Sequence, residues 1–176
     1  MLRLHPPLAL ITLRRIRKGQ RQAGQGVHVT EIVWRRDFET GIERIDHQHR
    51  ALLQLIQSCH EAVDSGCELT RIWRTVDEVA SYARFHFLSE ENFMLDVTFP
   101  DLERHRTLHA ELLRQLEQER ADLEASGAGL SQFMFFLYDW FVSHTVQEDR
   151  KIARYLEETK AGRTGVRRIK PASEES

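Results

Sequence analysis

The chain has 176 residues, of which 41% are hydrophobic, 9% aromatic and 30% charged. This length suits one domain of ordinary size, and the composition is typical of a globular protein, which excludes the disordered and fibrous classes. The apolar runs are much shorter than the roughly 20 residues of a membrane-spanning helix, so we expect no transmembrane segment. Two cysteines are too few for a disulfide scaffold or for a cysteine-type zinc site.

Charge is distributed unevenly along the chain, although the formal net charge is only −2. Residues 1–30 include six basic residues and no acidic one, whereas residues 31–156 include 14 basic and 23 acidic residues. An acidic domain lacks the cationic face that phosphate contacts need, so we do not expect nucleic acid as a partner. We expect the basic stretch to be a poorly ordered extension, with binding to an anionic surface as the alternative.

The order of residues near the N-terminus argues against a signal peptide. The short apolar stretch 8–13 precedes the basic stretch 14–18, whereas a signal peptide carries its positive charge before the apolar region. Cysteines that need no disulfide partner fit a reducing compartment. Together these features predict a cytoplasmic location.

Four segments repeat apolar residues at steps of three, four and seven, which is the period of an amphipathic helix. In chain order they span residues 46–64, 70–95, 101–124 and 130–158. Gly-containing or Pro-containing joints separate them, and residues 31–45 are expected to form an extended arm or loop. Helices of this length with short connections predict an all-α fold, an antiparallel up-down-up-down four-helix bundle with an N-terminal arm. The expected organisation is a basic extension (1–30), the bundle (31–158) and a polar C-terminal tail (159–176).

Histidines interrupt the apolar stripe of every one of these segments. The histidines that face the predicted bundle axis are His49, His86, His105, His109 and His144. A lone buried histidine is usually a hydrogen-bonded core residue, but five of them on four helices, together with inward acids, need a common partner. A metal satisfies them together, because neutral imidazole offers a lone pair and carboxylates supply negative charge.

The number and type of these side chains predict two ions rather than one. His86 and Glu90 share one helical face at a spacing of four, as do His105 and His109. Five imidazoles and two carboxylates exceed the coordination of a single ion. Mixed nitrogen and oxygen ligands favour iron, or manganese as a second choice, over tetrahedral zinc.

The last segment offers two candidate acids beside His144. Glu148 lies four residues after it, whereas Asp149 lies five residues after it and is rotated by about 140° on an ideal helix. Spacing alone therefore favours Glu148.

These residues resemble the hemerythrin family, and within it the single-domain bacterial hemerythrins, over about Ile32 to Leu156. The matching motifs are Gly41-Ile42-x-x-Ile45-Asp46-x-Gln48-His49-Arg50, His86-Phe87-x-x-Glu90-Glu91-x-x-Met94, His105-x-x-x-His109 and Trp140-x-x-x-His144-x-x-x-x-Asp149. The resemblance implies a four-helix bundle around two iron ions, a non-haem di-iron centre with an oxo or hydroxo bridge. The implied ligands are, for one iron, His105, His109 and His144; for the other, His49 and His86; and for both, the bridging acids Glu90 and Asp149. On this point the resemblance selects Asp149 over Glu148.

The resemblance implies reversible dioxygen binding rather than an enzyme activity. The bound dioxygen would serve storage, delivery to an oxygen-using enzyme, or sensing. An imidazole-rich site is less anionic than a carboxylate-rich one, which favours carriage over oxygen activation. The alternatives are a di-iron redox enzyme of the peroxidase or nitric-oxide reductase type, and a sensory or interaction module.

Four other polar residues near these motifs are not expected to be ligands. His47 is expected on the surface, and His60 is expected to pack or to be solvated. Asp46 is expected at a helix start or behind the ligands. Glu91 is expected to be a solvated neighbour of Glu90.

Overall fold

The structure is a computed structural model that describes residues 33–166. The predicted basic extension, residues 1–30, lies outside the described residues, as does the end of the predicted tail from residue 167. The elements in chain order are η1 (Arg36–Phe38), α1 (Glu43–Asp64), α2 (Leu69–Asp96), α3 (Leu102–Ser126), α4 (Leu130–His144), η2 (Thr145–Asp149) and α5 (Arg150–Val166).

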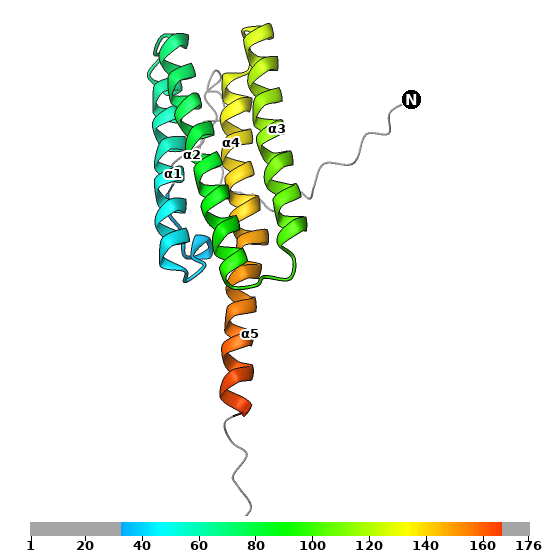
Figure 1. The fold of residues 1–176 in the computed structure, drawn as a ribbon. Helices are drawn as coiled ribbons and strands as arrows, with labels where there is room; N and C mark the ends of the chain where they lie inside the picture. The colour runs from blue at the N-terminus through cyan, green and yellow to red at the C-terminus, as the bar shows by residue number, and fades with distance from the viewer. Residues whose placement is uncertain (1–32, 167–176) are drawn as a thin grey trace, which may run out of the picture. The chain divides into compact units, whose positions relative to one another are not determined.

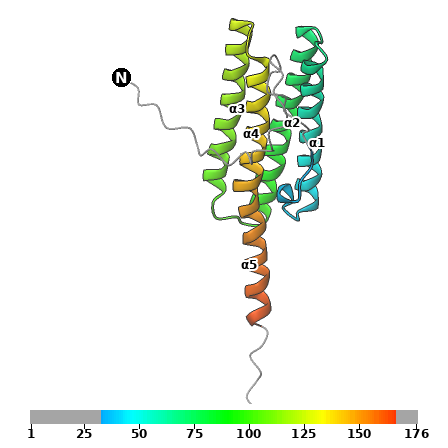
Figure 2. The same ribbon diagram turned by 180° about the vertical axis from the view of Figure 1, so that it is seen from behind.

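Helices α1 to α4 pack side by side with alternating directions (Figures 1 and 2). Helix α1 contacts α2 and α4, and α3 contacts the same two helices, so the four helices enclose a common core. The predicted all-α, up-down-up-down four-helix bundle is confirmed. Within the described part of the chain, no helix combines the length and the apolar character needed to cross a membrane.

The fourth predicted helix is interrupted and is longer than expected. It consists of α4, the π-helical turn η2 and α5, which continues the chain below the bundle in Figure 1. Helix α5 runs past Glu158 to Val166, into the stretch that the sequence assigned to a polar tail. Residues 159–161 contain no helix breaker, and the Thr159 hydroxyl donates to the carbonyl of Tyr155 within the helix, so polarity alone does not end it.

Helix α1 begins at Glu43, before the predicted start at Asp46. The Asp46 carboxylate accepts hydrogen bonds from the Thr40 amide at 2.7 Å, the Thr40 hydroxyl at 2.7 Å and the Gly41 amide at 3.1 Å. A carboxylate in the first turn of a helix also interacts favourably with the helix dipole. These contacts fix the arm against the start of α1 and confirm the expected role of Asp46 there.

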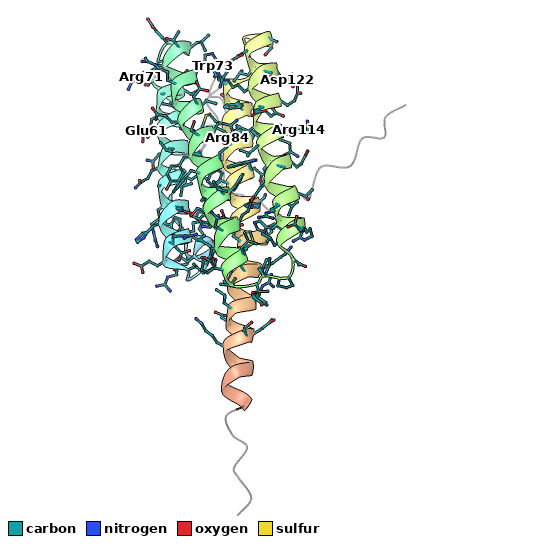
Figure 3. The ribbon with its side chains drawn as sticks, viewed as in Figure 1. Glu61, Arg71, Trp73, Arg84, Arg114 and Asp122 are labelled. Carbon is teal, nitrogen blue, oxygen red and sulfur yellow. The ribbon has the colours of Figure 1, made fainter. Side chains whose placement is uncertain are left out.

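The half of the bundle next to the α1–α2 and α3–α4 turns has an apolar core. Its buried residues are Ile56, Cys59, Ile72, Val76, Leu116, Leu123, Phe133 and Leu137. Gly127 ends α3 in the left-handed conformation, with φ of 63°, and its amide donates to the Leu123 carbonyl. Charged side chains such as Arg84 and Arg114 project from the outside of this half (Figure 3).

A second apolar cluster joins α5 to the connection between α2 and α3. Met94, Phe99 and Ile152 are buried together. The Tyr155 hydroxyl lies within hydrogen-bond distance of the Val97 carbonyl, at 3.3 Å, and of the Thr98 carbonyl, at 3.0 Å. The start of α5 therefore packs against the loop that leads into α3.

Candidate metal centre

All seven residues that the family resemblance implies as ligands are buried and lie at one end of the bundle. This is the end where α1 and α3 begin and where α2 and α4 finish. The seven side chains, each at most 7% exposed, are His49, His86, Glu90, His105, His109, His144 and Asp149. The predicted inward direction of the five histidines is confirmed.

The ligand atoms of these residues form two overlapping groups. One group contains three histidines (His105, His109 and His144) with Glu90 and Asp149, and the other contains two histidines (His49 and His86) with the same two acids. Within each group the candidate ligand atoms lie within 4.8 Å of one another. We call these groups the three-histidine group and the two-histidine group. Because Glu90 and Asp149 belong to both, two cations could share the two carboxylates.

The histidine rings turn the Nε2 edge toward the acids at the centre of the cluster. His49 Nε2 lies 3.1 Å from Asp149 Oδ2, and His144 Nε2 lies 3.0 Å from Asp149 Oδ1. His105 Nε2 lies 3.2 Å from Glu90 Oε2. The same atom of each ring therefore points toward the centre of the cluster.

On the opposite edge of three rings, which points away from the cluster centre, Nδ1 faces a hydrogen-bond acceptor. The Nδ1 atoms lie 3.4 Å from the Phe38 carbonyl oxygen for His49, 3.1 Å from Gln48 Oε1 for His86, and 2.8 Å from Glu91 Oε1 for His109. A carbonyl or carboxylate oxygen can only accept, so each of these Nδ1 atoms carries the proton. The inner Nε2 atom is then left with a lone pair, which is the form of histidine that binds a metal.

The inner atoms do not satisfy one another as hydrogen-bonding groups. The Nε2 atoms of His109 and His144 lie 3.0 Å apart. His49 Nε2, Glu90 Oε1 and both carboxylate oxygens of Asp149 are buried and have no hydrogen-bond partner among the described residues. Lone pairs and carboxylates converging in a buried space require positive charge between them. The donor set therefore fits a metal centre.

The pKa values in the cluster show the same demand for positive charge. Burial of His105 disfavours its charged form, but the Asp149 and Glu90 carboxylates beside the ring outweigh burial and raise its pKa to about 9. Burial and the charge of Asp149 act to raise the pKa of Glu90, yet the His105 and His109 rings beside its carboxylate lower it to about 2. Burial lowers the pKa of His86 to about 4, despite the nearby Glu90. Without a metal, Glu90 is thus ionised at neutral pH, His86 offers a lone pair, and His105 holds a proton that a bound cation would replace.

Residues 40–156 match the family described as the hemerythrin HHE cation binding domain. The match covers most of the chain, including every residue of the two groups. The chain belongs to the hemerythrin family. Membership implies a non-haem metal centre, in agreement with the buried donor set.

Curated relatives of this hemerythrin domain carry the name bacteriohemerythrin. That of Pseudomonas aeruginosa (strain LESB58) is 27% identical over 121 residues, which cover 69% of this chain and 78% of the relative. That of Clostridium acetobutylicum is 25% identical over 126 residues, covering 68% of this chain and 97% of the relative. That of Methylococcus capsulatus (strain Bath) is 25% identical over 115 residues, covering 65% and 87%.

The π-helical turn η2 decides which acid of the fourth helix enters the centre of this hemerythrin domain. A π-helical turn pairs residues i and i+5, so Asp149 comes to lie on the same face as His144. Glu148 points outward, where it pairs with Arg104 and, at 2.7 Å, with Lys151. The spacing-based expectation that Glu148 faces the site is wrong, because it assumed an ideal α-helix. The placement of Asp149 follows the family resemblance instead.

The sequence analysis did not predict the residues that accept hydrogen bonds from the histidine Nδ1 atoms. Glu91, expected to be solvated, instead hydrogen-bonds His109. Gln48 reaches His86 and also donates to the Ser89 hydroxyl at 2.8 Å. A usable signal was adjacency, because Gln48 and Glu91 each directly neighbour an inward residue. Such a position lies at the edge of the core, within reach of the next helix.

The two histidines expected outside the site do not belong to it. His47 is exposed, as predicted. His60 lies 3.3 Å from Asp64, one turn later in α1. Neither residue belongs to the two ligand groups.

Aromatic rings surround the polar cluster. Phe87 stacks on His109 with ring centroids 3.9 Å apart and an interplanar angle of 7°. The Phe141 and His49 rings lie nearly perpendicular with centroids 6.0 Å apart, and the Phe38 and Phe141 centroids are 5.4 Å apart. These rings replace water around the histidines and fix the ring orientations.

Proposed function

We propose that this chain binds dioxygen reversibly at a non-haem di-iron centre and does not act as an enzyme. The observation that carries the proposal is that Glu90 and Asp149 belong to both ligand groups. The ligands proposed for the iron pair are His49, His86, Glu90, His105, His109, His144 and Asp149. The family and the name bacteriohemerythrin of its relatives support the same proposal.

The donor chemistry supports iron. Mixed imidazole and carboxylate donors at a coordination number above four suit iron better than zinc. Glu90 and Asp149 would be the carboxylates that both ions share, and a solvent-derived oxo or hydroxo group would complete the centre. An iron pair held there would supply two electrons to dioxygen and recover them on its release.

The surroundings of the site support carriage over oxidation chemistry. With metal bound, five neutral imidazoles and two carboxylates would form a weakly anionic ligand set, which stabilises high-valent iron less than a carboxylate-rich one. Phe87 and Phe141 exclude water from the histidine faces. The proposed roles are oxygen storage, delivery to an oxygen-using enzyme, or sensing.

We propose that the functional unit is the bundle of residues 31–158. Every candidate ligand lies within it, and the family match at residues 40–156 falls inside the same limits. The basic extension 1–30 and the tail 159–176 are proposed to lie outside this unit.

Metal analysis combined with optical spectra of the whole protein tests this function. The protein loaded anaerobically with iron(II) should contain two iron ions per chain, and its spectrum should change reversibly over several cycles of oxygen addition and removal. Uptake of one iron, or irreversible oxidation in the first cycle, would contradict the proposal. Steady-state turnover of a peroxide or of nitric oxide would favour the redox-enzyme alternative.

A further inference from the structure

The hydrogen-bond partners behind the histidine rings differ in charge between the two groups. In the two-histidine group the partners are neutral, namely a backbone carbonyl behind His49 and the side-chain amide of Gln48 behind His86. In the three-histidine group the partner of His109 is the Glu91 carboxylate, at 2.8 Å. This is the shortest of the three contacts and the one made by an acid.

Glu91 lies between the metal centre and the surface. It follows the candidate bridging residue Glu90 on α2 and reaches across to α3, where the His109 ring is buried. The Glu91 side chain is 19% exposed, so it loses much of its contact with water. Its other oxygen, Oε2, lies 3.4 Å from Arg106 Nε, one turn before His109 on α3. Arg106 therefore stabilises part of the Glu91 negative charge and weakens the hydrogen bond between Glu91 and His109.

A carboxylate acts on a ligating histidine more strongly than an amide or a carbonyl does. A hydrogen bond with one ionised partner is about twice as strong as a neutral one. The carboxylate holds the Nδ1 proton, fixes the ring and makes the opposite nitrogen a stronger donor. Only the three-histidine group contains His109, so only that group gains directly from Glu91.

We propose that Glu91 is a positioning residue that makes the two metal sites unequal. It strengthens cation binding by the three-histidine group through His109, and Arg106 limits the size of the effect. This inference rests on the proposed function, because it requires two cations.

Anaerobic iron(II) titration against a competing chelator, with the full chain, tests the inference. Glu91→Gln keeps the shape and an acceptor oxygen but removes the charge. It should weaken one of the two iron sites by about 10–100-fold and leave the other unchanged. The matched control is Glu111→Gln, which removes an exposed carboxylate from α3 that pairs with Arg114 and should leave both sites unchanged.

Two further variants test the sign of the effect. Arg106→Gln should tighten the site that Glu91→Gln weakens, because the Glu91 charge is no longer shared. Gln48→Glu places a carboxylate behind His86 and should tighten the other site. The reduction potential supplies a second readout, since Glu91→Gln should raise the potential of one iron and Arg106→Gln should lower it.

The outcomes separate this inference from the proposed function. A wild-type protein that binds fewer than two iron ions contradicts the proposed function. A wild-type protein with two iron ions overturns the inference on Glu91 if Glu91→Gln binds both as tightly, or if it weakens both equally. If Glu91→Gln fails to fold, an Arg106→Gln protein with unchanged affinity and potential overturns it.

Discussion

The two halves of the bundle both bury their inward side chains, but one buries apolar side chains and the other buries polar ones. At the half next to the α1–α2 and α3–α4 turns, residues such as Val76 and Leu137 are fully buried by other apolar side chains. At the opposite half, Glu90 and Asp149 are just as buried, yet they retain oxygen atoms with no hydrogen-bond partner among the described residues. The first half can hold the fold by packing alone, whereas the second half needs a cation. Stability and metal binding are thus assigned to different ends of the same four helices.

The strongest way to break this comparison is to remove a shared acid. Asp149→Asn keeps the shape of the side chain but removes the charge common to both ligand groups, so the purified protein should lose nearly all of its bound iron. The matched control is Glu148→Gln, which alters the neighbouring acid that points outward and should leave the iron content unchanged. Metal analysis of both variants measures the effect, and equal losses in the two would contradict the assignment of Asp149 to the centre.

A truncation in the apolar half should have a large effect of another kind. Leu137→Ala removes a fully buried side chain and should lower the free energy of unfolding by about 2–5 kcal/mol. Because the site lies at the other end, the loss should be similar in the metal-free and the iron-loaded protein. Chemical denaturation of both forms measures it, and a loss confined to the loaded form would refute the separation of the two halves.

A smaller effect is expected where α5 is anchored. Tyr155→Phe removes the hydroxyl that faces the carbonyls of Val97 and Thr98 and should cost about 0.5–1.5 kcal/mol. The ring still packs against Phe99, so the iron content should stay the same. Thermal unfolding together with metal analysis tests this, and a loss of iron would show that the contact also holds the site.

No loss of iron is expected from the deletion of Gln147. The π-helical turn acts as a one-residue insertion, so removing this exposed residue should restore an ordinary α-helix with His144 and Asp149 four residues apart. Both side chains should remain in the centre, with unchanged iron content. A folded protein without iron would show that the turn has a role beyond placing Asp149.

Periodicity was sufficient for the fold and for the five inward histidines. It located every bundle helix, because a helix that buries one face repeats apolar residues every three or four positions. It misplaced the start of α1, which depends on hydrogen bonds between Thr40 and Asp46 that no period encodes. It also misjudged the far end of the fourth helix, where the polar residues after Glu158 remain helical.

The site required more than periodicity. Asp149 enters it through a π-helical turn, a local departure from the repeat on which the spacing argument depends, and only the family resemblance selected it. Gln48 and Glu91 act across the space between two helices, so their roles depend on how far each side chain reaches. Such contacts follow from the packed structure rather than from positions along one helix.

The arm before α1 sets a practical limit on how the domain can be excised. The family match starts at residue 40, but the carbonyl that faces His49 belongs to Phe38, a fully buried residue packed on Phe141. A gene trimmed to the matched boundary would encode every candidate ligand and still lose the group that orients one of them. A minimal version of this protein should therefore start upstream of η1.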